Sequence, residues 1–376
     1  MSGKQKVLAD PPCSDLLSPG FVMQLASDRT EGTEGVACSG RLRPVLSSQV
    51  NLAAQSPRAG EIPFTRALVK APEEIDYMPF IDSEGVKLYY EESGSGDAVI
   101  WIHEFAADYR TWEAQVRRFS RDYRCITYNA RGYPPSDVPE DGAAYSYEHQ
   151  RDDVLRIMDA LGIEKAHLVG LSMGAYSALQ FALAYPDRTL SVVFSSGGSG
   201  ASTADREQFK RDTWEGADRM LAEGMTAGAH GLAVGATRIQ LLNKDPRSWE
   251  DFRRFMSEHS ALGSALTLKN FQALRPPLNE FSDQLSRLNV PVLLAVGDED
   301  DPVIEVNIFL KRTLPRARLW IHPKTGHGIN LEEPDEYNRR IAEFLSAVER
   351  GAWRPRDSRA NPSQSVFMGD RSEERS

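Results

Sequence analysis

The stretch VGLSMGAY, residues 169–176, decides the fold, because it sets a serine between two glycines where an apolar run ends. It fits the pattern G-x-S-x-G with Ser172 at its centre. The run AHLVGLS (166–172) is typical of a buried strand, and AYSALQFALAYP (175–186) has the small residues and spacing of a helix. Two glycines without a Cβ allow a tight turn between them. We therefore predict a strand–turn–helix unit that holds the Ser172 hydroxyl at its tip as a nucleophile.

A serine hydroxyl is a weak nucleophile until a base accepts its proton. Among seven histidines, His327 stands out in PKTGHGINLEEP, because it follows a strand pattern, is flanked by glycines and precedes the last helix. A loop at the carboxyl end of a strand can carry an imidazole to the serine. We expect His322, in the preceding strand, to pack or form a hydrogen bond, and His103 to brace the loop that follows AVIWI (98–102).

The base needs a carboxylate to orient it, and one segment in the right place is rich in acids. AVGDEDDPV follows the strand pattern at 290–297 and precedes the His327 loop, which gives the chain order serine, acid, histidine. By position alone, any of its four acids could serve: Asp298, Glu299, Asp300 and Asp301. A solvated acidic turn accounts for some of them.

The remaining pattern alternates strands and helices, as in parallel βαβ units whose sheet is covered on both faces. We predict strands at 86–93, 98–103, 124–130, 166–172, 190–196, 290–297 and 317–323, and helices at 111–120, 149–162, 175–186 and 335–351. We assign residues 76–199 and 290–350 to this core, and the helix-rich interval 200–289 to a cap inserted into it. We predict that residues 1–75 form a disordered or loosely docked extension, whose deletion leaves activity and melting temperature nearly unchanged, and that 351–376 are a polar tail.

Bulk composition narrows the class of protein. The 376 residues carry a formal charge of −10, which argues against nucleic acid or an anionic membrane surface as the main partner. No run approaches the roughly 18–20 apolar residues of a membrane span, and no secretory signal is evident at the N-terminus. Three cysteines form no even disulfide framework, so we expect a cytoplasmic location. No metal-ligand cluster or phosphate-binding glycine loop is present, so we expect no metal or other cofactor.

The chain resembles the α/β-hydrolase superfamily, in its capped branch of esterases, lactonases and carbon–carbon hydrolases. The resemblance covers residues 78–350 and rests on HEFAADYRTWEAQ, NARGYPPSD, GLSMG, GDEDDP and TGHGINLEEP. It implies a mostly parallel, doubly wound sheet with an inserted helical cap. It also implies Ser172 as nucleophile, His327 as base and Asp300 as acid, with Asp298 as the second choice. Backbone N–H groups of Phe105 and Met173 would then form the oxyanion hole.

Glu104 departs from the family pattern, which has glycine after the histidine of this loop. Three interpretations remain open. Glu104 turns away and pairs with a cation such as Arg110 or Arg131, or it faces the pocket and selects a cationic or hydrogen-bond-donating substrate, or it distorts the oxyanion hole. A carboxylate aimed at a developing oxyanion would oppose it, so a competent enzyme needs Glu104 turned away or neutralised. We expect ordinary β or α dihedrals at this position.

The resemblance implies hydrolysis of a small to medium ester or lactone through an acyl-enzyme on Ser172. Alternatives are cleavage of a ring-fission diketone at a carbon–carbon bond, a cofactor-free oxygenase or perhydrolase, and a non-catalytic ligand-binding module. The expected partner is a small molecule; the sequence does not predict an oligomeric state. Besides Glu104, candidate pocket residues are Trp214, Phe255 and Phe271, although such residues at helical spacing more often form the core of the cap.

Overall fold

The computed structural model describes residues 79–201 and 206–360. The predicted extension 1–75 and the final part of the predicted tail lie outside the described residues. Within the described part, no helix is long and apolar enough to cross a membrane.

The centre of the fold is an eight-stranded sheet in the order β1-β2-β4-β3-β5-β6-β7-β8. The pairs β1–β2 and β2–β4 are antiparallel, and all later pairs are parallel, which confirms the mostly parallel sheet. The strands are β1 (Phe80–Ser83), β2 (Val86–Ser93), β3 (Ala98–Ile102), β4 (Arg124–Tyr128), β5 (Ala166–Leu171), β6 (Thr189–Ser195), β7 (Val292–Gly297) and β8 (Ala317–His322). The short edge strand β1 has no counterpart among the predicted strands.

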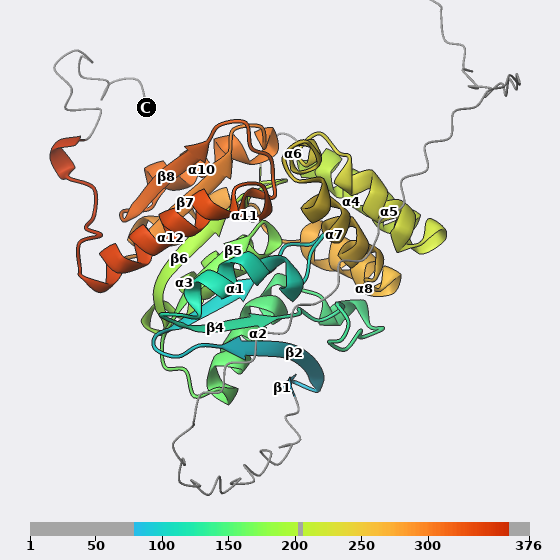
Figure 1. The fold of residues 1–376 in the computed structure, drawn as a ribbon, viewed down its shortest axis with the longest axis horizontal. Helices are drawn as coiled ribbons and strands as arrows, with labels where there is room; N and C mark the ends of the chain where they lie inside the picture. The colour runs from blue at the N-terminus through green and yellow to red at the C-terminus, as the bar shows by residue number, and fades with distance from the viewer. Residues whose placement is uncertain (1–78, 202–205, 361–376) are drawn as a thin grey trace, which may run out of the picture. The chain divides into compact units, whose positions relative to one another are not determined.

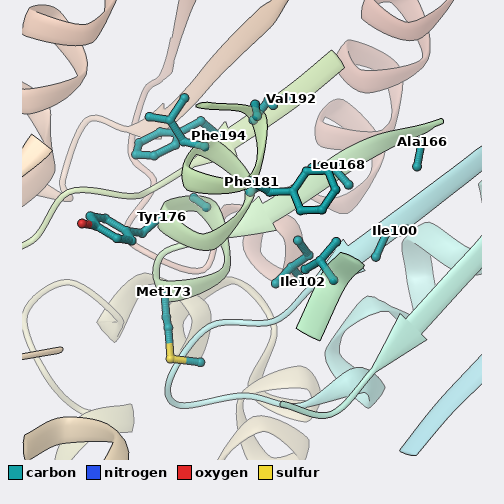
Figure 2. Close-up of a cluster of buried hydrophobic side chains, with 14 of the residues drawn as sticks. Ile100, Ile102, Ala166, Leu168, Met173, Tyr176, Phe181, Val192 and Phe194 are labelled. Atoms are coloured by element: carbon teal, nitrogen blue, oxygen red, sulfur yellow. The ribbon is translucent and has the colours of Figure 1, made fainter. Parts of the chain in front are cut away.

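Helices cover both faces of the sheet, as the continuous apolar strands require. One face packs against α2 (Tyr147–Ala160), α3 (Met173–Ala184) and α10 (Asp301–Thr313), and the other against α1 (Glu113–Phe119) and α12 (Pro334–Glu349). Side chains alternate between the faces, because successive residues of a strand point in opposite directions. The hydrophobic residues on the face covered by α2, α3 and α10 form one buried group, which we call the sheet cluster. Figure 2 shows part of it, with Ile100, Leu168 and Val192 from three neighbouring strands and Phe181 from α3.

The strand order reverses between β3 and β5, because the chain passes from β3 to β4 on one side and then to β5 on the other. In open parallel sheets, ligands bind beyond the carboxyl ends of the strands at such a switch point. The loop after β3 begins at His103, and the turn after β5 carries Ser172. The fold thus brings the two most distinctive sequence motifs to one place.

Between β6 and β7 the chain forms a group of helices beside one end of the sheet (Figure 1). They are α4 (Arg206–Glu223), α5 (Met225–Ala233), α6 (Ile239–Lys244), α7 (Pro246–Ser257) and α8 (Ala261–Leu266), followed by a π-helical segment, Thr267–Gln272. We call α4 to α8 the cap. The last part of the same interval belongs to the core, since Leu278 and Leu285, the latter from α9 (Ser282–Arg287), pack in the sheet cluster.

Short helical elements complete the described chain. They are α11 (Ile329–Glu332) and the 3₁₀ turns Tyr109–Trp112, Gly142–Ala144, Pro186–Arg188, Leu278–Phe281 and Ser358–Ala360. Beyond residue 350, where we expected the core to end, Trp353 is buried against Phe344, and its indole N–H donates to the carbonyl of Arg316 at 2.8 Å. The first residues after α12 therefore still pack on the core.

Candidate active site

The turn between β5 and α3 is strained at the serine. Ser172 has φ 52° and ψ −108°, a conformation that costs a non-glycine residue free energy. The flanking glycines make it possible. A Cβ on Gly174 would lie 2.1 Å from the carbonyl oxygen of Ile102, and one on Gly170 would lie 2.3 Å from that of Gly174. The Ser172 side chain is partly exposed at the N-terminus of α3, where the helix dipole favours negative charge.

The structure brings His327 and Asp300 together. Nδ1 of His327 lies 2.8 Å from Oδ2 of Asp300, and both side chains are buried. The remaining oxygen of Asp300, Oδ1, has no hydrogen-bond partner among the described residues. Asp300 ends the β7 loop as the N-cap residue of α10, and His327 lies in the loop between β8 and α11. A carboxylate in this position fixes the imidazole tautomer that leaves Nε2 free to accept a proton.

The other acid and histidines near this rim have different partners. Asp298 is exposed, and its Oδ1 accepts the backbone N–H of Thr325 at 3.2 Å. His322 contacts the Thr325 hydroxyl at 2.8 Å, as expected of a hydrogen-bonding residue. His103 accepts the N–H of Ala130 at Nε2, so its Nδ1–H donates to the Glu104 carbonyl. Burial lowers the pKa of His103 to about 4, so a neutral imidazole braces this loop.

The residues expected to form the oxyanion hole follow β3 and β5, which are paired in register from Ala98 to Ile102. Met173 is the first residue of α3, so its N–H has no acceptor within the helix. Phe105 is fixed from behind, because the hydroxyl of Tyr133 donates to its carbonyl at 2.9 Å. Their role in binding an oxyanion stays a prediction.

Glu104 forms a buried ion pair with Arg238, a cap residue at the start of α6. Nη1 of Arg238 donates to Oε1 of Glu104 at 2.8 Å, and Nη2 donates to Oε2. Burial alone would raise the pKa of Glu104, but attraction and hydrogen bonds from Arg238 outweigh it and hold this pKa below its usual value. The carboxylate is also 3.7 Å from Nε2 of His327. Glu104 is therefore neutralised but lies against the imidazole.

The partners suggested for Glu104 from the sequence were wrong. Arg110 pairs with Asp108 and Glu258, and Arg131 pairs with Asp153. Arg238 lies 134 residues from Glu104 in the chain, and nothing in the sequence marks it as a partner. Glu104 is absent from the positive-φ residues of the described chain, so its backbone has the ordinary conformation that we expected.

The segment around α6 is fastened to the histidine loop by several contacts. The backbone N–H of His327 donates to the carbonyl of Thr237 at 2.6 Å, and a Cβ on Gly326 would lie 2.1 Å from that carbonyl oxygen. Lys244 pairs with Glu333 at 2.7 Å, and Gln240 donates to Glu299 at 2.6 Å. The cap thus contacts the loops that carry His327 and Asp300.

The aromatic pocket candidates lie in three different places. Trp214 is 42% exposed on the cap and donates to the carbonyl of Lys269. The guanidinium groups of Arg110 and Arg254 both lie over the ring of Phe255, and Phe271 is buried against Tyr176. The structure brings none of the three into contact with His327 or Glu104 through an interaction among the described residues.

A cavity of about 600 Å³ in the cap adjoins Phe105. Apolar side chains of α4 and α5, among them Met220 and Leu232, line it together with Leu268. Helical glycines also border it: Gly216, Gly228 and Gly231. Its volume is in the range of small-molecule sites. Among the described residues, no group of His, Cys, Asp and Glu side chains could hold a metal ion.

A family model described as the alpha/beta hydrolase fold matches residues 97–334. The chain belongs to this family. A protein of Bacillus subtilis named putative 2-succinyl-6-hydroxy-2,4-cyclohexadiene-1-carboxylate synthase is 30% identical over 71% of this chain and 97% of its own length. A 2-hydroxy-6-oxo-6-phenylhexa-2,4-dienoate hydrolase of Burkholderia cepacia is 31% identical over 69% of this chain and 91% of its own.

Among solved structures, an esterase of Thermogutta terrifontis is similar, with a TM-score of 0.65 and 26% identity over 72% of this chain and 98% of that one. Family and relatives together support a hydrolase enzyme of the α/β-hydrolase fold, for which small-molecule substrates are usual. They leave open which bond is cleaved.

Proposed function

We propose that the protein is a serine hydrolase that cleaves a small to medium carboxylic ester or lactone through an acyl-enzyme on Ser172. The observation that carries the proposal is the 2.8 Å contact between His327 and Asp300, at the rim where the strained turn presents Ser172. Nucleophilic acyl transfer requires an imidazole that is held by a carboxylate and can accept the proton of the serine hydroxyl.

In the first half of the reaction, Oγ of Ser172 bonds to the substrate carbonyl carbon while its proton passes to Nε2 of His327. The π electrons of the carbonyl move to its oxygen, which the N–H groups of Phe105 and Met173 stabilise. Collapse of this intermediate breaks the bond to the alkoxide, which takes the proton from Nε2 as it leaves. In the second half, water bonds to the acyl carbon, its proton passes through His327 to Ser172, and the acid departs.

The oxyanion step depends on where Glu104 points. Charge that develops on the substrate oxygen is stabilised by fixed N–H donors, and each such donor contributes about 10²–10³ in rate. Arg238 neutralises the Glu104 carboxylate, which removes the repulsion that an isolated carboxylate would exert on an oxyanion. The ion pair therefore makes the unusual residue compatible with acyl transfer.

Cleavage of a carbon–carbon bond in a ring-fission diketone is the second candidate, and the relative from Burkholderia cepacia favours it by its name. That name describes a dienoate, which carries a carboxylate. In this chain two donors of Arg238, whose side chain is 11% exposed, are already bound to Glu104. A substrate carboxylate would have to compete with Glu104 for it. This favours an uncharged ester or lactone.

A panel of substrates tests the proposal. Purified protein and the variant S172A are assayed with p-nitrophenyl esters of increasing acyl length, with lactones and with a ring-fission diketone. We expect ester or lactone turnover that falls by at least about 10⁴-fold in S172A. Turnover of the diketone alone would replace the ester proposal by the carbon–carbon proposal. Folded protein that hydrolyses nothing and does not react with a fluorophosphonate would indicate a ligand-binding module instead. A cytoplasmic location stays a prediction.

A further inference from the structure

The imidazole of His327 has carboxylates on both sides. Oδ2 of Asp300 lies 2.8 Å from Nδ1, and Oε2 of Glu104 lies 3.7 Å from Nε2. Asp300 has the role expected in this family, but Glu104 stands where the pattern has glycine. Its side chain is 1% exposed, so water screens its charge little.

Arg238 holds Glu104 in this place. Its two hydrogen bonds engage both carboxylate oxygens, as a guanidinium fork does when it fixes the plane of a carboxylate. Arg238 is itself placed by the backbone, since the neighbouring Thr237 accepts the N–H of His327. The ring of Phe252 lies 5.1 Å from the guanidinium and supports it from the cap. These contacts of Arg238 therefore fix the position of Oε2 of Glu104.

The charges of this group balance only when the imidazole is protonated. With neutral His327, the two carboxylates and Arg238 leave one net negative charge in a buried place. With imidazolium, the four groups are neutral. The imidazolium is the species that forms when Ser172 gives up its proton, so the arrangement favours the charge distribution of the transition state over that of the resting enzyme.

Other charged groups facing this loop do not change that balance. From α11, Glu332 accepts the N–H of Gly326 at 2.8 Å, and burial raises its pKa. From α6, Lys244 lies 3.5 Å from Glu332 and compensates it. His103, in the loop after β3, is buried and neutral. Glu299, next to Asp300, is exposed and bound by Gln240.

We propose that Glu104 is a positioning residue for the proposed base: its carboxylate, aimed by Arg238, accepts the Nε2–H of the His327 imidazolium that forms during acyl transfer. A movement of less than about 1 Å converts the 3.7 Å separation into a hydrogen bond. The proton that Nε2 received from Ser172 stays on Nε2 and passes from there to the leaving group, so Glu104 transfers no proton itself. This inference rests on the proposed function for its kinetic consequences, but not for its effect on the imidazole.

The variant E104Q tests the charge with almost no change of shape. Without the carboxylate, Arg238 opposes protonation of His327, so the acidic limb of the kcat/KM profile moves to lower pH by about one unit. We expect kcat to fall about tenfold while KM changes little, because the lost interaction forms only with the imidazolium. The control E113Q removes a carboxylate that pairs with Arg117 on the exposed surface, and it should shift neither quantity.

Two further measurements keep the test decisive. The variant E104Q/R238Q leaves no buried unpaired charge, so it folds even if E104Q does not, and its acidic limb should lie between those of E104Q and the unchanged protein. The titration of His327, followed by histidine-selective NMR in S172A protein and assigned with H327Q, reads the same shift without turnover. If E104Q shifts the NMR titration of His327 but the protein with Ser172 intact hydrolyses no ester or lactone, the proposed function would be rejected and the role of Glu104 kept. If the midpoint of the His327 titration is unchanged or higher in both E104Q and E104Q/R238Q, the proposed role of Glu104 would be overturned.

Discussion

The turn that carries Ser172 and the cap segment at α6 are held in place in different ways. The turn between β5 and α3 is shaped by its own sequence, because Gly170 and Gly174 leave room for backbone that a Cβ would block. The cap segment at α6 has no such local determinant. It is placed by contacts with loops far away in the chain: Thr237 with His327, and Arg238 with Glu104.

The two segments have different parts in the proposed reaction. In the proposed function the turn supplies the nucleophile and His327, held by Asp300, supplies the base, and all three residues follow strands of the sheet. The cap supplies Arg238, which neutralises the carboxylate of Glu104 near the imidazole of His327. Changes at the sheet rim should therefore reduce the chemical step most, changes at the contacts between cap and core should reduce stability more than chemistry, and changes within the cap alone should do little to either.

The largest effect is expected from D300N. The amide keeps the shape but can stabilise the wrong tautomer of His327 and cannot balance an imidazolium, so kcat should fall by about 10³–10⁴-fold with the fold intact. The matched control D298N changes the exposed acid that was the second choice from sequence, and kcat should stay within about threefold. Steady-state ester hydrolysis of both variants measures this. A larger loss in D298N than in D300N would exchange the two assignments.

A second effect, on stability, is expected at the contact between the β3 loop and α7. Asp108 is buried and pairs with Arg110 at 2.7 Å and with the cap residue His259 at 3.1 Å. D108N replaces this buried carboxylate by a neutral amide and leaves Glu258 as the remaining ion-pair partner of Arg110 among the described residues, so it should lower the free energy of unfolding by about 2–3 kcal/mol at pH 7, with kcat within about fivefold. The control D159N affects an exposed pair with Arg188 and should cost about 0.5 kcal/mol or less.

The pH dependence of this loss has a definite sign. Burial alone would raise the pKa of Asp108, but hydrogen bonds from His259 and Arg110 outweigh it, so the pKa lies below its usual value. The stabilisation is therefore complete above about pH 4, the ordinary value for aspartate, and is lost as the pH falls below it. The free energy of unfolding of the unchanged protein and of D108N can be measured with denaturant at pH 7 and below pH 4. The difference between the two proteins should be smaller below pH 4. A constant difference would show that charge is not its cause.

The smallest effect is expected from G231A in α5. A Cβ at Gly231 would meet nothing within 4 Å, and alanine favours a helix over glycine by up to about 1 kcal/mol. We expect a gain of about 0.5–1 kcal/mol, a rise of one to a few degrees in melting temperature and unchanged kcat. A large change in KM for long-chain esters, measured beside the thermal scan, would show instead that substrate occupies the cavity that Gly231 borders.

The same contrast explains what the sequence could predict. Ser172, His327 and Asp300 are recognisable because each lies at a strand end with its own local signal: glycines at the turn, glycines around the histidine, and an acidic turn after β7. Arg238 carries no such signal, since its role depends on a partner 134 residues away. The partners guessed for Glu104 were wrong because Arg110 and Arg131 each have a nearer acid.

Element predictions failed where packing rather than periodicity decides. The edge strand β1 is only four residues long, too short for an alternating pattern to stand out. Helix α10 was not predicted. It follows the acidic turn directly, and its buried face contains the polar Asn307, whose amide donates to the carbonyl of Gly197. The interval 200–289 was assigned to the cap as a block, but its last part packs in the core through Leu278 and Leu285.

A crystal structure of the protein after reaction with a fluorophosphonate would show whether Ser172 is the nucleophile and which N–H groups bind the oxyanion. We expect phosphorus bonded to Oγ of Ser172, a phosphoryl oxygen within hydrogen-bond distance of the N–H groups of Phe105 and Met173, and Glu104 still held by Arg238 beside His327. An adduct on another residue, or a phosphoryl oxygen turned away from both N–H groups, would contradict this expectation.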